Sequence, residues 1–168
     1  SDILAAWPVV YTIDRAAGAE NGTASPGTAL SGNDTINGDD DADELHGGRG
    51  DDTMNGGNGV DSMYGEDGND VMNGDADGDW MFGDKGNDTM HGNAGGDYMR
   101  GGDNDDTMFG DAGADEMYGD SGLDTMQGGD DVDTMRGGIG ADCMAGNDGD
   151  DVMNGDADND RMVGGSFE

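Results

Sequence analysis

The sequence predicts an all-β solenoid of about fifteen nine-residue turn-strand units, two units per coil, around a core of stacked methionines. Three observations predict this fold. An aspartate recurs at every ninth residue, one apolar residue follows each aspartate two places later, and a glycine follows each apolar residue after two more places. The register holds from Asp34 to Gly164 without an insertion or deletion, which chance cannot explain.

Two series of residues carry the repeat, together with the glycine that opens each unit. With that glycine as position 1, the aspartate stands at position 6 and the apolar residue at position 8. The apolar series consists of Ile36, Leu45 and then all 13 methionines, from Met54 to Met162. The aspartates are Asp34, Asp43, Asp52, Asp61, Asp70, Asp79, Asp88, Asp97, Asp106, Asp115, Asp124, Asp133, Asp142, Asp151 and Asp160.

Each unit combines a strand with a turn. Positions 7 to 9 are expected to form a short strand, for example Thr107, Met108 and Phe109. In a strand the middle side chain points to one face and its two neighbours point to the opposite face. The remaining six residues are rich in Gly, Asp and Asn and favour a turn. Two units therefore complete a coil. Binding of Cu(I) by thioethers is an alternative role for the methionines, but their regular inward position favours core packing.

The composition points to cations as partners. The 168 residues include 40 Asp and Glu against 6 Lys and Arg, a net charge of −34. Without its period such an acidic chain would be expected to be disordered, and it lacks the clustered Lys and Arg that bind nucleic acid. The longest apolar run, residues 3–13, is shorter than the roughly 20 residues of a membrane helix, so no transmembrane segment is expected.

The unit G-(D/G/N)-x-(G/D/N)-x-D-x-M-x resembles the RTX, or hemolysin-type, nonapeptide repeat G-G-x-G-x-D-x-U-x, in which U is apolar. The resemblance covers residues 32–168 and implies a right-handed parallel β-roll that binds calcium. The chain departs from this consensus in two ways. Met stands at U in most units, and other residues replace glycine at position 2 or position 4 in several units. Asp and Asn tolerate a left-handed backbone best among non-glycine residues, so the turn is expected to survive. The departures are Asp39, Glu66, Asp75, Asp84, Asp111, Asp120 and Asp156 at position 2, and Asp41, Asp77, Asn104, Asp131 and Asp158 at position 4.

Calcium is the expected source of stability. Two apolar side chains per coil are too few to offset an ordering cost of about 1–2 kcal/mol per residue. Calcium takes about six to eight oxygens from carboxylates and backbone carbonyls. The resemblance implies that the ions lie between adjacent turns and are held by the fifteen repeat aspartates and by turn carbonyls. Alternate aspartates fall on opposite edges, one row beginning at Asp34 and the other at Asp43, with room for up to about 13 ions.

The outward residues of the two predicted sheets differ. One sheet carries a row of threonines at position 7, as an ice-binding solenoid does, but its position 9 is mixed. The other sheet gathers a candidate partner surface of Tyr64, Trp80, Phe82, Tyr98, Arg100 and Tyr118. The alternative interpretation of this surface is cross-strand stacking that only stiffens the sheet.

Few residues outside the repeat suggest chemistry. His46 and His91 are expected to be isolated and solvated on the outer faces. Cys143 is expected to be an outward free thiol, with an intermolecular disulfide as the alternative. No Ser–His–Asp, Cys–His or paired-acid set is identifiable, because the carboxylates belong to the repeat. We therefore expect no enzymatic activity.

The two ends of the chain shape the predicted function. Residues 1–31 are expected to form an N-terminal arm or cap, with docking on a neighbouring subunit as the alternative, and residues 32–168 the roll. No cap is evident after Met162, which favours head-to-tail stacking into a filament or surface layer. The prediction is a secreted or cell-surface calcium-binding structural protein that self-assembles. The alternatives are an adhesin or ice-binding module, with a glycan or ice as ligand, and the repeat region of a type I-secreted enzyme or toxin.

Overall fold

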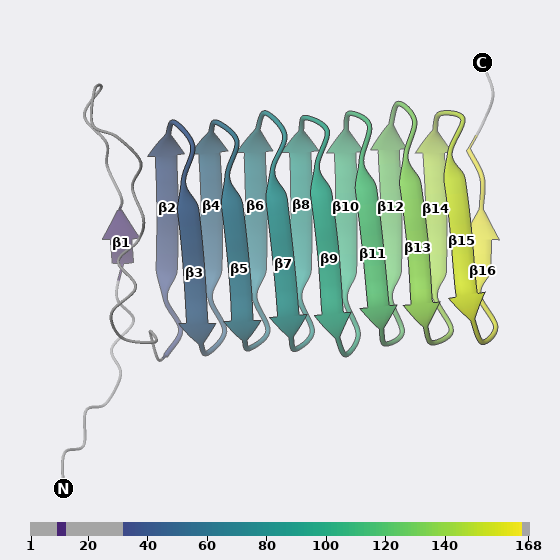
Figure 1. Ribbon diagram of the computed structural model, residues 1–168, viewed down its shortest axis with the longest axis horizontal. Coiled ribbons are helices and arrows are strands. Elements are labelled where there is room, and N and C mark those ends of the chain that lie inside the picture. The colour runs from purple at the N-terminus through teal and green to yellow at the C-terminus, as the bar shows by residue number, and fades with distance from the viewer. Residues whose placement is uncertain (1–9, 13–31, 166–168) are drawn as a thin grey trace, which may run out of the picture.

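A computed structural model describes residues 10–12 and 32–165, which form two parallel β-sheets (Figure 1). Sheet A contains β1 (Val10–Thr12), β2 (Thr35–Asp40), β4 (Thr53–Asn58), β6 (Val71–Ala76), β8 (Thr89–Ala94), β10 (Thr107–Ala112), β12 (Thr125–Asp130), β14 (Cys143–Asp148) and β16 (Arg161–Val163). Sheet B contains β3 (Glu44–Arg49), β5 (Ser62–Asp67), β7 (Trp80–Lys85), β9 (Tyr98–Asp103), β11 (Glu116–Ser121), β13 (Thr134–Ile139) and β15 (Val152–Ala157). Among the described residues, no helix has the length and apolar character needed to cross a membrane.

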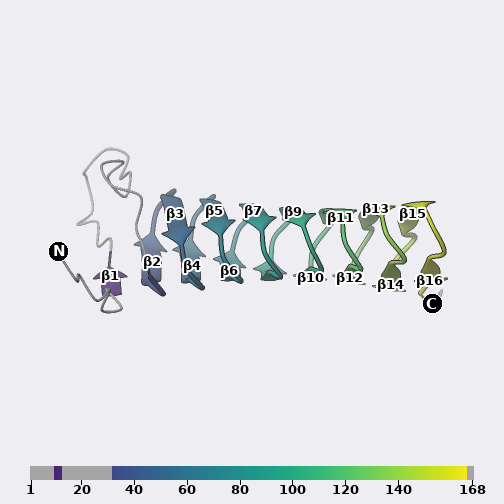
Figure 2. The same cartoon turned by 90° about the horizontal axis from the view of Figure 1, so that it is seen from below.

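The coils stack in register. Within each sheet a strand pairs in parallel with its counterparts in the coils before and after it, so Met108 of β10 pairs with both Met90 of β8 and Met126 of β12. Figure 2 shows the coils from the side, with the two sheets as facing layers. The predicted parallel solenoid with two units per coil is therefore confirmed. Equivalent residues of successive coils lie one strand spacing apart, about 4.8 Å.

The residues at position 8 fill the space between the sheets. Ile36, Leu45 and the methionines from Met54 to Met144 have at most 1% of their surface exposed. Met153 is partly buried against this core, and Met162, in the last described strand, is 49% exposed. The unbranched methionine side chain adapts to the narrow space between the layers. The core is only one residue wide in each sheet, so it is thin, as the sequence predicted.

The strands are longer than the sequence predicted. We expected strands of three residues and turns of six, and this was wrong, because the central strands span six residues, from position 7 to position 3 of the next unit. Strand pairing continues through position 3, the last of these six residues. For example, Ala112 of β10 pairs with Ala94 of β8. The physical reason lies in the glycine at position 1, which points inward and is buried as a second core position. With no side chain there, the backbone keeps its place in the ladder and the turn shrinks to three residues.

The departures from glycine adopt the expected left-handed backbone. Their φ angles are positive at all twelve, from 64° at Asp156 to 80° at Asn104. The prediction that Asp and Asn preserve the turn is thus confirmed. Glu66, with φ 74°, is less expected at such a position, because a longer side chain gains less from local hydrogen bonding. A contact with His46, described below, accounts for it.

The N-terminal arm is described only in part. Strand β1 adds to sheet A by pairing in parallel with β2, with Tyr11 opposite Ile36. This strand covers one side of β2, as a cap would. The rest of the predicted arm, residues 1–9 and 13–31, lies outside the described residues, and docking on a neighbouring subunit stays a prediction.

Candidate metal centre

The repeat aspartates form two buried rows, one along each edge of the roll. Each stands directly before a strand, as Asp106 does before β10 and Asp115 before β11. From Asp34 to Asp142 they are at most 5% exposed, while Asp151 and Asp160 near the last described coil are half-buried. Successive members of one row are joined by hydrogen bonds between coils. The alternation between edges follows because two units complete one coil.

From Asp52 to Asp151, each aspartate accepts such a bond through only one of its carboxylate oxygens. The backbone N–H of Asp88 donates to Asp106 Oδ1 at 2.8 Å, and that of Asp106 donates to Asp124 Oδ1 at 2.9 Å. The second oxygen is buried and has no hydrogen-bond donor among the described residues. A buried carboxylate oxygen without a partner is costly, so the row is incomplete as it stands. These oxygens are Oδ2 of Asp52, Asp61, Asp70, Asp79, Asp88, Asp97, Asp106, Asp115, Asp124, Asp133, Asp142 and Asp151.

A backbone carbonyl faces the same space as the unpartnered oxygens from Asp52 to Asp142. A Cβ atom added to Gly47 would lie 2.7 Å from Asp52 Oδ2 and 2.8 Å from the carbonyl oxygen of Gly65, one coil later. The same arrangement recurs at the position-1 glycine of every unit from Gly38 to Gly137. Glycine is therefore required at position 1 because any side chain would enter the space between the two oxygens.

This donor set fits calcium. It combines a carboxylate with backbone carbonyls from adjacent coils, which are the ligands that calcium prefers. No three His, Cys, Asp or Glu side chains gather around one point in residues 10–12 and 32–165. Backbone carbonyls would therefore supply many of the ligands, and soft or imidazole-seeking metals have no matching site among these residues.

Burial raises the pKa of the row carboxyl groups from Asp52 to Asp142, because removal from water disfavours their charged form. The backbone N–H that each accepts lowers the pKa, and neighbouring carboxylates raise it again. The result is a pKa of about 6 for Asp61, about 7 for Asp70 and about 8 for Asp79 and Asp106, against 3.8 for an ordinary Asp. Without a cation, many of these groups would be protonated in the folded roll near neutral pH.

In calcium-free solution the roll is therefore expected to be more stable at about pH 5 than at about pH 8. A carboxyl whose pKa is raised by folding binds more protons when folded, so the folded state is favoured at low pH. That advantage is complete below about pH 4 and is lost as the pH rises through about 6 to 8. Far-ultraviolet circular dichroism in EGTA, measured as a function of pH, checks this.

The midpoint of that transition separates two causes. Carboxylates in water titrate near pH 4, so general charge repulsion would place the midpoint there. A midpoint between about pH 6 and 8 identifies the buried rows. A midpoint near pH 4, or no recovery of β-structure on acidification, would contradict the prediction.

The predicted partner surface is brought together on the outward face of sheet B. Tyr64 stacks on Phe82 with ring centroids 5.1 Å apart, and Trp80 stacks on Tyr98 at 5.0 Å. Tyr118 lies 5.5 Å from Tyr98 at a tilted angle. Because neighbouring rings cover one another's faces, they present mainly edges to solvent. This arrangement disfavours the stacking of a sugar ring on an aromatic face.

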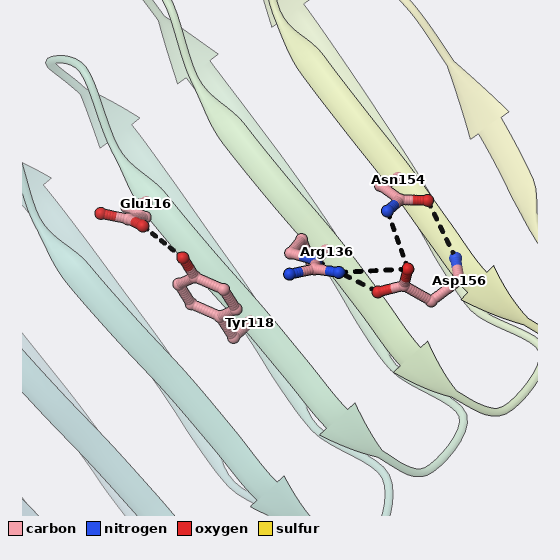
Figure 3. A network of polar contacts seen from close by, with 5 residues as sticks. All are labelled: Glu116, Tyr118, Arg136, Asn154 and Asp156. Atoms are coloured by element: carbon pink, nitrogen blue, oxygen red, sulfur yellow. Dashed lines mark hydrogen bonds and ion pairs between the residues drawn. The ribbon is translucent and has the colours of Figure 1, made fainter.

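The structure also shows contacts between basic and acidic side chains that we did not predict from the sequence. Each described basic residue at position 9 of a unit faces an acid twenty residues later, at position 2. Arg136 makes two hydrogen bonds to Asp156, of 3.1 and 3.3 Å, and Asn154 Nδ2 also donates to that carboxylate (Figure 3). Figure 3 also shows Tyr118 donating to Glu116. The other pairs are His46 with Glu66, His91 with Asp111 and Arg100 with Asp120.

The expectation that the histidines are isolated was therefore wrong. His46 Nδ1 lies 3.0 Å from Glu66 Oε1, and the ring stacks on Tyr64 with centroids 4.8 Å apart. His91 stacks on Phe109 at 4.7 Å on the opposite sheet. The spacing of twenty residues between a basic position 9 and an acidic position 2 was the sequence signal for these contacts. It also explains why Glu66 occupies a left-handed position.

The outward face of sheet A is polar and irregular. Side-chain amides join Asn37, Asn55 and Asn73 in a hydrogen-bonded ladder, with distances of 2.7 and 2.9 Å. The row then changes to His91 and Phe109, so it does not present the second regular row that ice binding needs. Cys143 on this face is a free, half-buried cysteine, and Arg161 donates to its Sγ at 3.6 Å.

Comparison with known proteins agrees with this geometry. A family model described as the RTX calcium-binding nonapeptide repeat (4 copies) matches the chain in overlapping stretches. They are residues 28–63, 46–81, 55–90, 82–117, 91–126, 109–144 and 137–167. Together the stretches extend from residue 28 to residue 167. No curated protein matches the chain.

Proposed function

Because this chain belongs to the RTX calcium-binding nonapeptide repeat family, we propose that it is an extracellular structural protein whose coils are held together by calcium. The repeats of this family bind Ca²⁺ and are typical of secreted proteins. Their β-roll is a structural calcium-binding repeat rather than a catalytic fold, and we assign no enzymatic activity to this chain.

One observation carries the proposal. Twelve buried carboxylate oxygens within the described coils lack a hydrogen-bond donor, and most of them share their space with a carbonyl oxygen of the next coil. In this proposal the position-6 aspartates and turn carbonyls hold calcium along both edges of the roll. The ions supply positive charge where the chain has none, and so convert repulsion between coils into attraction. Up to about 13 ions fit between successive aspartates of the two rows.

The number of bound ions tests the site assignment. We expect about a dozen calcium ions per chain after gel filtration in a low-calcium buffer, measured by elemental mass spectrometry. Asp106→Asn should reduce this number by about one or two, because Asp106 lies between the coils before and after it. The amide oxygen can still accept the N–H of Asp88, so the hydrogen bond is retained.

Asp130→Asn is the matched control, because Asp130 is an exposed acid at position 3 of a unit. This variant should bind as many ions as the unchanged chain. A total of only one or two ions in the unchanged chain, or equal loss in both variants, would contradict the assignment to the buried rows.

We also propose that the rolls stack end to end into a filament or surface layer. Support comes from the last described coil, where Met162 is 49% exposed although the equivalent methionines from Met54 to Met144 are buried. Another coil stacked on β15 and β16 would bury Met162 and continue both sheets. Electron microscopy of the calcium-loaded protein at high concentration should show linear assemblies. Particles of one or two chains only would contradict this part of the proposal.

A further inference from the structure

The outward face of sheet B differs from that of sheet A in its charge. Of the Lys and Arg residues in the described part of the chain, four lie on sheet B: Arg49, Lys85, Arg100 and Arg136. Arg161 alone lies on sheet A. A chain of net charge −34 has thus placed most of its described positive side chains on one face, beside its stacked aromatic rings.

Three of these side chains, those of Arg49, Lys85 and Arg100, border an open groove of about 780 Å³ on that face. Phe82 and Arg100 come from position 9 of their units, and Lys85 and Asp103 come from position 3. Gly101 and Gly102 line the groove with backbone only. The groove therefore joins the aromatic row and the charged row into one continuous surface.

The charged row alternates in sign along the roll. Arg49, Asp67, Lys85 and Asp103 occupy the same position in four successive strands of sheet B, β3, β5, β7 and β9. Asp67 lies 3.7 Å from Arg49 and 2.5 Å from Lys85. The side chains remain substantially exposed, at 75% for Arg49, 46% for Asp67 and 67% for Lys85, so they can pair with a second partner.

An alternating row of four charges is complementary to its own reverse. Read from β3 to β9 the signs are plus, minus, plus, minus, and read backwards they are minus, plus, minus, plus. We propose that a second copy of this chain docks face to face on sheet B, about a two-fold axis parallel to the strands and midway between β5 and β7. Asp67 then faces Lys85 of the second copy, and Arg49 faces its Asp103.

The same axis places aromatic residues at the centre of the interface. It sets Tyr64 of each copy opposite Phe82 of the other copy. Trp80, which is 49% exposed in the single chain, lies beside these rings and is covered by the second copy. An apolar centre with charged pairs at its margin is the usual organisation of a protein interface. The outward ring edges, which suit a sugar poorly, suit packing against other ring edges.

The charges of the groove favour this occupant over an anion. Three basic residues line the groove, against five acids, namely Glu66, Asp67, Asp84, Asp103 and Asp120. An anionic ligand would meet a net negative surface. A second copy carries the same net charge, but its charges are positioned to present a negative charge to each of Arg49 and Lys85 and a positive charge to each of Asp67 and Asp103. The axis also sets Glu66 opposite Asp84 of the second copy, a like-charge contact that weakens the dimer.

The interface is small, so the dimer should be weak and calcium-dependent. Four strands about 4.8 Å apart, each presenting about 20 Å of outward face, give about 400 Å² per copy, about half of a standard interface. Two chains of charge −34 repel each other unless calcium neutralises them. With calcium bound, sedimentation equilibrium should show a monomer–dimer equilibrium with a Kd of about 10–100 µM.

A charge exchange between copies tests the pairing. Lys85→Asp and Asp67→Lys each place like charges opposite one another, and each variant alone should dimerise at least about tenfold more weakly. An equimolar mixture of the two variants restores both opposite-charge contacts, so it should form a mixed dimer as readily as the unchanged chain. Fluorescence energy transfer between differently labelled variants detects that mixed dimer.

The control is Asp130→Lys, which makes the same charge change at position 3 on sheet A and should leave dimerisation unchanged. Circular dichroism in calcium verifies that every variant retains the roll. Dimerisation of both single variants at unchanged strength, failure of the mixture to associate, or a monomeric unchanged chain at about millimolar concentration would overturn the proposal. These variants leave the aspartate rows and the coil ends intact, so failure of the face-to-face pairing can be distinguished from failure of calcium binding or of end-to-end assembly.

Discussion

Removal of calcium with EGTA near neutral pH is expected to unfold the roll completely and reversibly. Twelve buried carboxylate oxygens among the described residues would then have neither a cation nor a hydrogen-bond donor, and most of them share their space with a carbonyl oxygen. Each buried group without a partner costs about 1–3 kcal/mol, and more when charged, so twelve of them cost about 12–36 kcal/mol, which matches or exceeds the roughly 5–15 kcal/mol by which a domain is stable. Partial protonation reduces this cost but does not remove it at about pH 7.5, because several of the carboxyl groups have a pKa of only about 6.

The measurement is far-ultraviolet circular dichroism during titration with EGTA and then with calcium. The β-sheet signal should disappear on chelation and return cooperatively on addition of calcium, because each ion organises the turns of two coils. Magnesium at the same concentration should not restore it, since magnesium prefers a smaller octahedral site with several waters. A spectrum and melting temperature unchanged in EGTA would show that the buried carboxylates do not depend on a cation.

Much of the roll was predictable because its period is strict. A nine-residue register places Met99 and Met108 in facing sheets and Asp97 and Asp106 on opposite edges, and the structure confirms this placement. These residues repeat in every coil, so one unit defines all the others. The alternation of buried position 8 and exposed positions 7 and 9 follows from the period-two geometry of strands.

The strand length was not predictable from the same pattern, because glycine has two meanings in it. Gly101 and Gly102 both suggest a turn by composition, but only Gly102 has a left-handed backbone, with φ 117°. Gly101 is an inward residue of an extended strand, and its lack of a side chain makes room for Asp106. Because both residues are glycine, the sequence does not distinguish the inward strand position from the left-handed one.

The ion pairs on the outer faces were missed for a related reason. We interpreted Glu66 and Asp120 only as tolerated replacements for glycine, which considers one residue at a time. Their partners His46 and Arg100 lie twenty residues earlier, one coil and two residues away. A search for acids at that spacing from each basic residue would have found all four pairs.

Replacement of a position-1 glycine by alanine is expected to disrupt calcium binding and destabilise the roll. At Gly65 the added Cβ would lie 2.5 Å from Asp70 Oδ2 and 2.7 Å from the carbonyl oxygen of Gly83. Both are closer than any ordinary contact, and one is a backbone atom fixed by the next coil. Overpacking of this kind costs about 1–3 kcal/mol, and displacement of two calcium ligands adds to it. We expect the melting temperature in calcium to fall by about 10 °C.

Gly96→Ala is the matched control, because the chemical change is the same but the site differs. Gly96 is exposed at position 5, where Ala42, Ala114 and Ala141 occur naturally, and its Cβ would lie 3.1 Å from the carbonyl oxygen of Ala114. Neither Gly65 nor Gly96 has a left-handed backbone, so strain in φ does not contribute at either site. The control should change the melting temperature in calcium by no more than about 2 °C.

The comparison decides what the first glycine of the unit is for. If that glycine served only a flexible turn, alanine would be tolerated at Gly65, because its backbone is extended rather than left-handed. A stable, fully calcium-loaded Gly65→Ala variant would therefore contradict the inference that Asp70 Oδ2 and the Gly83 carbonyl share a site. Destabilisation that grows with calcium concentration would instead support it, since the variant loses stability that only the ion supplies. In EGTA near neutral pH the two variants should be equally unfolded.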